Sequence, residues 1–223
     1  CQYYASEIDK YAIQVAKASH PDIVHIGDVK QVKSDKYSLG WVEGEKRCRL
    51  SFKKKSYNGF DLLIGGSPCQ DLSIAKKDRK GLQGDRSSLF YEYLRILNEV
   101  KPKYFILENV YSMGKENAKI ISKELFDIEP IMINSALLTA QNRKRLYWVG
   151  KLVDGKYEQV KIEQPEDQEI YLKDIIEEGI TDREKSYCPD DYVSMVSNTQ
   201  GYKGLGNSFT VPVIKYLIQS IIK

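Results

Sequence analysis

The sequence predicts an α/β fold in which helices cover both faces of a doubly wound, mostly parallel sheet. Short apolar runs alternate with stretches of helical periodicity over about the first 150 residues. The runs at residues 60–64 and 104–107 are apolar and bounded by turn or polar residues, as is typical of strands buried on both faces. A chain of 223 residues can bury one good-sized core, with room for a small lobe.

The N-terminal third supplies the first strands and the first helix. Residues 3–6 predict the end of a strand, and residues 9–20 predict a helix that Pro21 ends. A second short strand follows at residues 23–26, before Gly27.

The central part continues the alternation. After the strand at 60–64, residues 87–100 place apolar side chains at helical spacing, and Pro102 ends that helix. A strand follows at 104–107, then a helix at 117–125 and a strand at 128–133. The last helix, predicted at 210–222, returns to the core.

Two polar segments interrupt this order. Residues 33–59 predict an inserted hairpin or loop, which is either simply solvated or a basic patch that contacts phosphates. Residues 151–204 predict a small, truncated second lobe, so that 1–150 and 205–223 form the main domain.

Composition excludes several classes of protein. No apolar run approaches the roughly 20 residues of a membrane helix. The four cysteines lack paired spacing, which argues against a disulfide framework or a metal site and favours a reducing cytoplasm. The net charge of +3 does not by itself indicate nucleic-acid binding, although a local patch would suffice.

Polar residues follow the predicted strands at the edge where open α/β sheets bind ligands. Glu7 follows the first strand, Asp28 the second, Cys69 the third and Glu108 the fourth. A lone cysteine is more often a small buried residue than a nucleophile. The double glycine and proline before Cys69 change that expectation, because they predict a tight turn that presents the thiol, and residues 71–86 predict a lid.

The segment QNRKR places Gln141, Arg143 and Arg145 at alternate positions. In a strand these three side chains would share one face and suit a planar or anionic ligand. The alternative is an exposed basic edge strand that discourages aggregation.

Taken together, these motifs resemble the cytosine-5 DNA methyltransferases. The similarity rests on GGSPCQDLS (65–73), ENV (108–110), QNRKR (141–145) and GNSFTVPVI (206–214), in the family's order. SEID (6–9) and GDV (27–29) are similar to the family's cofactor motifs. The SPC and DLS segments resemble animal de novo enzymes, while the chain as a whole is more similar to phage and bacterial members. The resemblance implies a Rossmann-like methyltransferase sheet.

The resemblance implies a covalent mechanism on a cytosine flipped out of duplex DNA. Cys69 would attack carbon 6 as a thiolate, and Glu108 would hold ring nitrogen 3 and the amine. Arg145 would contact the cytosine carbonyl, with Arg143 in support. Carbon 5 then takes the methyl group of S-adenosylmethionine, and elimination frees the enzyme.

The resemblance also implies the cofactor site. Glu7 would bind the ribose hydroxyls, Asp28 would accept from the adenine amine, and Ile8 and Val29 would lie against the ring. The remaining pocket residues would be Pro68, Leu89, Asn207 and Ser208.

Two family parts are not visible in the sequence. The glycine-rich turn that should precede Glu7 by roughly 20 residues would lie before Cys1. Near Cys188-Pro189 the target recognition domain is reduced to a remnant, so we expect these two residues not to be neighbours in the native product.

The partner implied is double-stranded DNA, and no membrane is expected. The expected state is a monomer, and whether a restriction endonuclease acts as a partner stays open. The expected location is the cytoplasm of a bacterial or phage-infected cell. Two other functions remain open: a catalytically silent relative that binds DNA or a partner, and an RNA cytosine methyltransferase. The target DNA sequence is left undetermined.

Overall fold

The structure is a computed structural model of the 223-residue chain. It describes residues 2–35, 38–43, 46–51, 59–66, 89–171, 174, 197 and 208–222.

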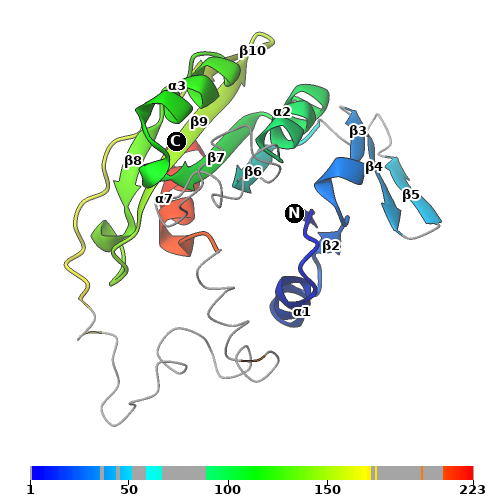
Figure 1. The fold of residues 1–223 in the computed structure, drawn as a ribbon, viewed down its shortest axis with the longest axis horizontal. Helices are drawn as coiled ribbons and strands as arrows, with labels where there is room; N and C mark the ends of the chain where they lie inside the picture. The colour runs from blue at the N-terminus through cyan, green and yellow to red at the C-terminus, as the bar shows by residue number, and fades with distance from the viewer. Residues whose placement is uncertain are drawn as a thin grey trace.

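A five-stranded sheet forms the centre of the molecule, in the order β10-β9-β7-β6, with β8 also paired to β9 (Figure 1). Its strands are β6 (Leu62–Gly66), β7 (Tyr104–Val110), β8 (Ile131–Asn134), β9 (Lys144–Val153) and β10 (Lys156–Gln159). The strands β6 and β7 pair in parallel, while β7, β8 and β10 all pair antiparallel to β9. Four of the strands therefore run in one direction and β9 alone runs against them, which confirms the mostly parallel sheet.

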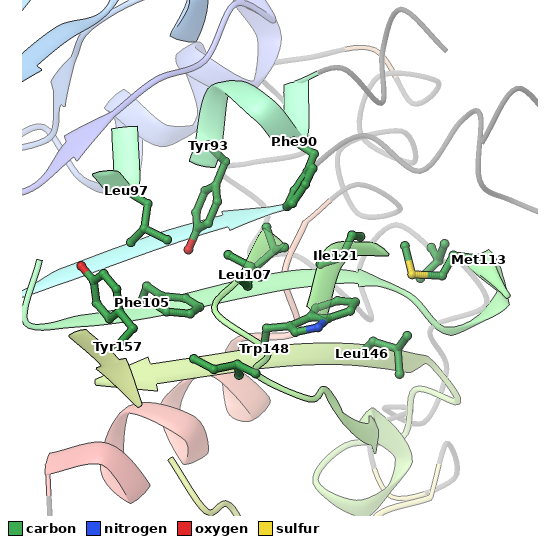
Figure 2. Packing of buried hydrophobic residues seen from close by; sticks show 13 residues of the cluster. Phe90, Tyr93, Leu97, Phe105, Leu107, Met113, Ile121, Leu146, Trp148 and Tyr157 are labelled. Carbon is green, nitrogen blue, oxygen red and sulfur yellow. The ribbon is translucent and has the colours of Figure 1, made fainter. Parts of the chain in front are cut away.

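Helices cover both faces of this sheet. The helices α2 (Leu89–Val100) and α3 (Lys115–Glu124) cover one face, and α7 (Val211–Ile222) covers the other. The alternation of β7 decides the layers, because Phe105 and Leu107 face α2 and α3 while Ile106 faces α7. Figure 2 shows Phe90, Tyr93 and Leu97 of α2 directed toward the sheet. The doubly wound α/β class is thus confirmed.

A small N-terminal unit lies beside the central sheet. It contains β1 (Tyr4–Ala5), α1 (Lys10–Ser19), β2 (Val24–His25) and the short 3-10 helix η1 (Val29–Gln31), with β1 and β2 paired in parallel. The side chain of Asp9 begins α1, because it accepts the backbone N–H groups of Tyr11 and Ala12. Ile26 and Val32 anchor the unit by packing with Phe60 and with Ile96 of α2.

The inserted segment after η1 is an antiparallel meander. Its strands are β3 (Lys33–Asp35), β4 (Ser38–Glu43) and β5 (Lys46–Ser51), in the order β3-β4-β5. The hairpin predicted within 33–59 is confirmed for the backbone. The basic patch stays a prediction.

The structure moves several predicted boundaries. The strand predicted at 104–107 continues to Val110, because β9 pairs with it along its whole length. The strand predicted at 128–133 begins only at Ile131, since Phe126 and Asp127 form a turn with positive φ angles. The central sheet continues past the expected boundary at residue 150 to Gln159, at the end of β10. The lobe expected beyond it stays a prediction.

No helix within the described residues is long and apolar enough to cross a membrane.

Candidate active site

The predicted cofactor residues of the N-terminal unit come together at one end of β1 and β2. The parallel register pairs Ala5 with His25, so the residues that follow the two strands leave the same edge. The Ser6 hydroxyl donates to the Gly27 carbonyl at 2.7 Å and joins the two turns. Glu7 and Asp28, which are 21 positions apart in the sequence, therefore lie on adjoining turns.

Glu7 is held by its own turn. Its Oε1 accepts the backbone N–H groups of Ile8 and Asp9, each at 2.8 Å. Its Oε2 has no hydrogen-bond partner among the described residues and can accept from a ligand. The next side chain, Ile8, is 73% exposed, so an apolar surface lies beside this carboxylate.

Asp28 is held in a similar way by the start of η1. Its Oδ1 accepts the backbone N–H of Lys30 at 2.9 Å. The following residue, Val29, offers its carbonyl oxygen to Arg95 of α2 at 3.0 Å. This bond connects the Asp28 turn to the helix that packs on the central sheet.

A second group of polar residues lies on the central sheet. Arg145 Nε and Glu108 Oε1 are 2.8 Å apart, and the two side chains are only 18% and 13% exposed. They come from the neighbouring strands β9 and β7. Burial raises the pKa of the Glu108 carboxyl above its ordinary value, although the charges of Arg145 and Arg143 act in the opposite direction. Glu108 can therefore carry a proton more readily than an exposed carboxyl.

The end of β6 lies beside this ion pair. Gly66 is paired with Glu108 in the parallel register. A Cβ at position 66 would lie 3.0 Å from Glu108 Oε2 and 3.4 Å from the Phe209 ring. Glycine is thus favoured here by the close approach of the carboxylate rather than by the backbone angle, because a Cβ would make the carboxylate shift.

The prediction that Gln141, Arg143 and Arg145 alternate along one strand is wrong. β9 begins only at Lys144. Before it, Asn134 Oδ1 accepts the backbone N–H of Arg143 at 3.0 Å and draws this segment into a loop. The edge-strand alternative is also wrong, because β9 lies inside the sheet.

The arginines nevertheless remain at the site by separate routes. Arg145 pairs with Glu108, whereas Arg143 Nη2 donates to the Ser208 carbonyl at 2.9 Å. This second contact brings Ser208 to the end of the central sheet that carries Glu108 and Arg145, which we call the rim. The predicted role of Ser208 in the cofactor pocket stays a prediction.

Sequence reasoning missed a hydroxyl network that joins the C-terminal segment to this rim. Thr210, directly before α7, accepts from the buried Ser135 hydroxyl at 2.9 Å and donates to Gln141 Oε1 at 3.3 Å. Nothing in the sequence pairs Ser135 with Thr210, because they are 75 positions apart.

The remaining predicted residues have different outcomes. Leu89 is half-buried at the start of α2. Pro68, Cys69 and Asn207 lie outside the described residues, as does the predicted lid at 71–86. Among the residues that the structure describes, no group of three or more His, Cys, Asp or Glu side chains could hold a metal ion.

The fold and the rim residues define an α/β protein with its polar groups gathered at strand ends. The family model of the C-5 cytosine-specific DNA methylases matches residues 2–188. The chain belongs to this family.

The chain is also similar in sequence to methyltransferases of phages and bacteria. The orphan methyltransferase M.SPRI of Bacillus phage SPR is 35% identical over 156 residues, which cover 65% of this chain and 31% of the relative. The type II methyltransferase M1.ScrFI of Lactococcus lactis subsp. cremoris is 27% identical over 301 residues, covering 99% of this chain and 72% of the relative. A crystal structure described as that of a "putative DNA modification methyltransferase" encoded within an E. coli prophage aligns with a TM-score of 0.46, at 24% identity over 67% of this chain and 39% of that chain.

The chain spans about a third of the length of M.SPRI and 27% of the length of M.Rho11sI of Bacillus phage rho11s. What these relatives do as whole proteins is therefore a separate matter from the family membership of this chain.

Proposed function

We propose that the protein is a DNA (cytosine-5-)-methyltransferase that acts on a cytosine flipped out of double-stranded DNA. The observation that carries the proposal is the Glu108–Arg145 pair, at 2.8 Å and largely buried, beside the end of β6. A carboxyl with a raised pKa next to a guanidinium matches a cytosine ring, which offers a ring nitrogen, an amine and a carbonyl oxygen.

Cys69 is the proposed nucleophile. It lies three positions after Gly66, which pairs with Glu108, so the chain can carry it no more than about 10 Å from that point. Its thiolate would add to carbon 6 of the base, forming an S–C bond. Carbon 5 would then take the methyl group, and loss of the proton from carbon 5 with cleavage of the S–C bond would restore the double bond of the ring and the thiolate.

Glu108 and Arg145 would stabilise the base during this addition. Glu108 would bind ring nitrogen 3 and the amine, supplying a hydrogen bond or a proton as charge develops on the ring. Arg145 would donate to the carbonyl oxygen. Arg143 would support it from the Ser208 side, to which it is bound.

The residues of the N-terminal unit fit S-adenosylmethionine, which supplies the methyl group when bound. Glu7 has one carboxylate oxygen held and the other directed at no described partner, as a ribose diol requires. Ile8 would cover the adenine ring, since its exposed apolar side chain gains from such a contact. Val29 would lie on the ring with it, and Asp28 would accept from the adenine amine. Pro68, Leu89, Asn207 and Ser208 would complete the pocket.

Covalent trapping tests this proposal directly. The full-length protein is incubated with labelled S-adenosylmethionine and a sequence-diverse DNA library that contains 5-fluorocytosine. Because fluorine blocks the loss that follows methyl transfer, we expect a labelled covalent protein–DNA adduct. The adduct should vanish in Cys69→Ser and persist in Cys48→Ser, the matched control.

Other outcomes would overturn the proposal. DNA binding without any adduct would indicate a catalytically silent relative. Methyl transfer to transfer RNA but not to DNA would indicate an RNA enzyme.

We also propose that a target recognition lobe follows β10 and that Cys188 and Pro189 are not neighbours in the native product. The family match ends at Cys188, and the alignment with M1.ScrFI runs over 301 residues although this chain has 223. A native mass well above 25.7 kDa is expected, and a mass equal to it would contradict the proposal. We propose a monomer, which sedimentation of the native protein would test.

A further inference from the structure

Arg95, in the middle of α2, is a charged side chain away from the Glu108–Arg145 pair that makes several hydrogen bonds. Its Nε donates to Glu92 Oε2 at 2.9 Å, and its Nη1 donates to both carboxylate oxygens of Glu99 at 2.9 and 3.0 Å. Its Nη2 donates to the Val29 carbonyl at 3.0 Å. Each nitrogen of the guanidinium is therefore engaged, and its plane is fixed.

The two carboxylates orient Arg95 rather than compete with the Val29 contact. Glu92 and Glu99 lie one helical turn before and after Arg95 on the same face of α2. Their hydrogen bonds and charges raise the pKa of Arg95, against the opposing effect of burial. Because the guanidinium is planar and rigid, the Nη2 of Arg95 stays directed from α2 toward η1.

The bond to Val29 joins the N-terminal unit to α2, the helix that packs on the central sheet. No strand of the N-terminal unit pairs with the central sheet within the described residues. Their described contacts are mainly apolar and involve Ile26 and Val32 packed with Phe60 and Ile96. In Figure 1, α2 lies between the central sheet and the segment that leads from η1 into β3. Apolar packing does not fix the direction in which one element lies from another. A hydrogen bond from a rigidly held guanidinium fixes both the distance and the direction.

The location of the bond matters for the site. Val29 directly follows Asp28, and on the other side the Gly27 carbonyl is held by Ser6. The Asp28 turn is therefore held at the residue before it, toward β1, and at the residue after it, toward α2.

We propose that Arg95 is a positioning residue for the cofactor end of the site. Through the Val29 carbonyl it holds the Asp28 turn at a set distance from the catalytic strand β7. This inference rests on the proposed function, since the turn needs an S-adenosylmethionine to position. Arg95 itself touches no reacting atom.

Two substitutions of Arg95 in the full-length protein separate this role from simple stabilisation. Arg95→Met removes the donor, while Arg95→Lys keeps the charge but loses the fork. We expect the dissociation constant for S-adenosylmethionine, measured by calorimetry, to rise about tenfold in Arg95→Met, the size of a lost hydrogen bond from a charged donor. The kcat at saturating cofactor and the KM for DNA should stay within about twofold of wild type.

The matched control is Lys119→Met on α3. Lys119 also pairs with a carboxylate on its own helix, Glu116, at 3.7 Å, but contacts no other element through that pair. It should leave all three constants unchanged. If Arg95→Met does not fold, Arg95→Lys carries the test, with a smaller rise in the same constant.

A double-mutant cycle with Asp28→Asn tests the route of the effect. If Arg95 acts through the Asp28 turn, Arg95→Met should weaken cofactor binding less in the Asp28→Asn protein than in wild type. The inference is overturned by unchanged cofactor affinity in both Arg95 variants, by a fall in kcat alone, or by fully additive losses. Wild-type protein that binds no S-adenosylmethionine would instead overturn the proposed function, and this inference with it.

Discussion

At the scale of single residues, Glu108 shows how burial and charge compete. The nearby guanidinium groups of Arg145 and Arg143 favour the ionised carboxylate, while removal from water disfavours it more strongly. The result is a carboxyl whose pKa is raised in spite of an ion pair at 2.8 Å. That balance suits a group expected to share a proton with a ring nitrogen.

The raised pKa of Glu108 predicts a pH-dependent contribution to stability. The folded protein binds this proton more tightly than the unfolded chain, whose carboxyl has an ordinary pKa near 4.5. The stabilisation is complete below that value and is lost as the pH rises through the raised pKa. Compared with Glu108→Gln, the wild type should therefore lose free energy of unfolding as the pH increases above about 4.5, measured by urea denaturation at a series of pH values. If the wild type instead gained free energy of unfolding relative to Glu108→Gln as the pH rises, the charges of the arginines would outweigh burial.

The two glycines that end β6 predict different effects of substitution, one on activity and one on stability. Gly66→Ala places a Cβ 3.0 Å from Glu108 Oε2 and should displace the carboxylate from Arg145. A misplacement of this kind can cost about 100-fold in kcat/KM. Gly65→Ala directs its Cβ into the Tyr93 ring at 2.5 Å and should lower the free energy of unfolding by about 1–3 kcal/mol. Methylation assays and urea denaturation of both variants check the contrast, and equal activity losses would contradict it.

At the scale of elements, the pairing of β7 with β9 organises the site. The register places Glu108 opposite Tyr147, and Arg145 opposite Val110, so the two charged side chains are diagonal neighbours. The same strands bury Phe105, Leu107 and Trp148 against α2 and α3 (Figure 2). The Glu108–Arg145 pair is thus positioned by core strands rather than by loops.

The contact between α3 and β9 predicts a measurable coupling. The buried Trp148 Nε1 donates to the Ser122 hydroxyl at 3.0 Å. Ser122→Ala should leave that donor unpaired and lower the free energy of unfolding by about 1–3 kcal/mol. In a Trp148→Phe protein the same substitution should cost much less, as a double-mutant cycle would measure.

The control for this cycle is Ser220→Ala on α7. The Ser220 hydroxyl donates only to a backbone carbonyl of its own helix, that of Tyr216. Its substitution should stay within about 0.5 kcal/mol of wild type. Additive losses for Ser122 and Trp148 would mean that their hydrogen bond contributes little.

At the scale of the whole molecule, the two halves of the site rest on units of different stability. The central sheet is covered on both faces by apolar clusters, whereas the N-terminal unit is anchored by the small cluster around Ile26 and Val32. Regions with few buried apolar contacts open locally at lower free energy than the core.

Hydrogen exchange should reveal this difference. The amide of Val24 donates to the residue before β1, and the amide of Ile26 donates to β1 itself. Both should exchange much faster than the amides of Phe105 and Leu107 in β7. If S-adenosylmethionine binds at the proposed site on the folded N-terminal unit, it should slow the exchange of the first pair more than that of the second. Equal protection of both pairs would show that the molecule opens as one cooperative unit.

The sequence by itself determined the fold class, most elements and the family. Apolar periodicity and turn residues are local signals, so they are readable without the fold, and the motif order is a property of the chain. The sequence also indicated that Glu7 and Asp28 follow neighbouring parallel strands, because such strands share their carboxyl ends. The expectation that Glu108 lies at the same sheet edge is wrong, since β1 and β2 form a two-stranded sheet apart from the one that contains β7. Cys69, Pro68 and Asn207 stay predictions.

Only the tertiary structure decided how the site is held. The loop before β9, the Ser135–Thr210 contact and the Arg95–Val29 bond join residues that are far apart in the sequence. The spacing of Glu92, Arg95 and Glu99 could have indicated an ordered arginine, but not the carbonyl that it reaches. Such contacts depend on how separate elements dock, and local periodicity carries no information about docking.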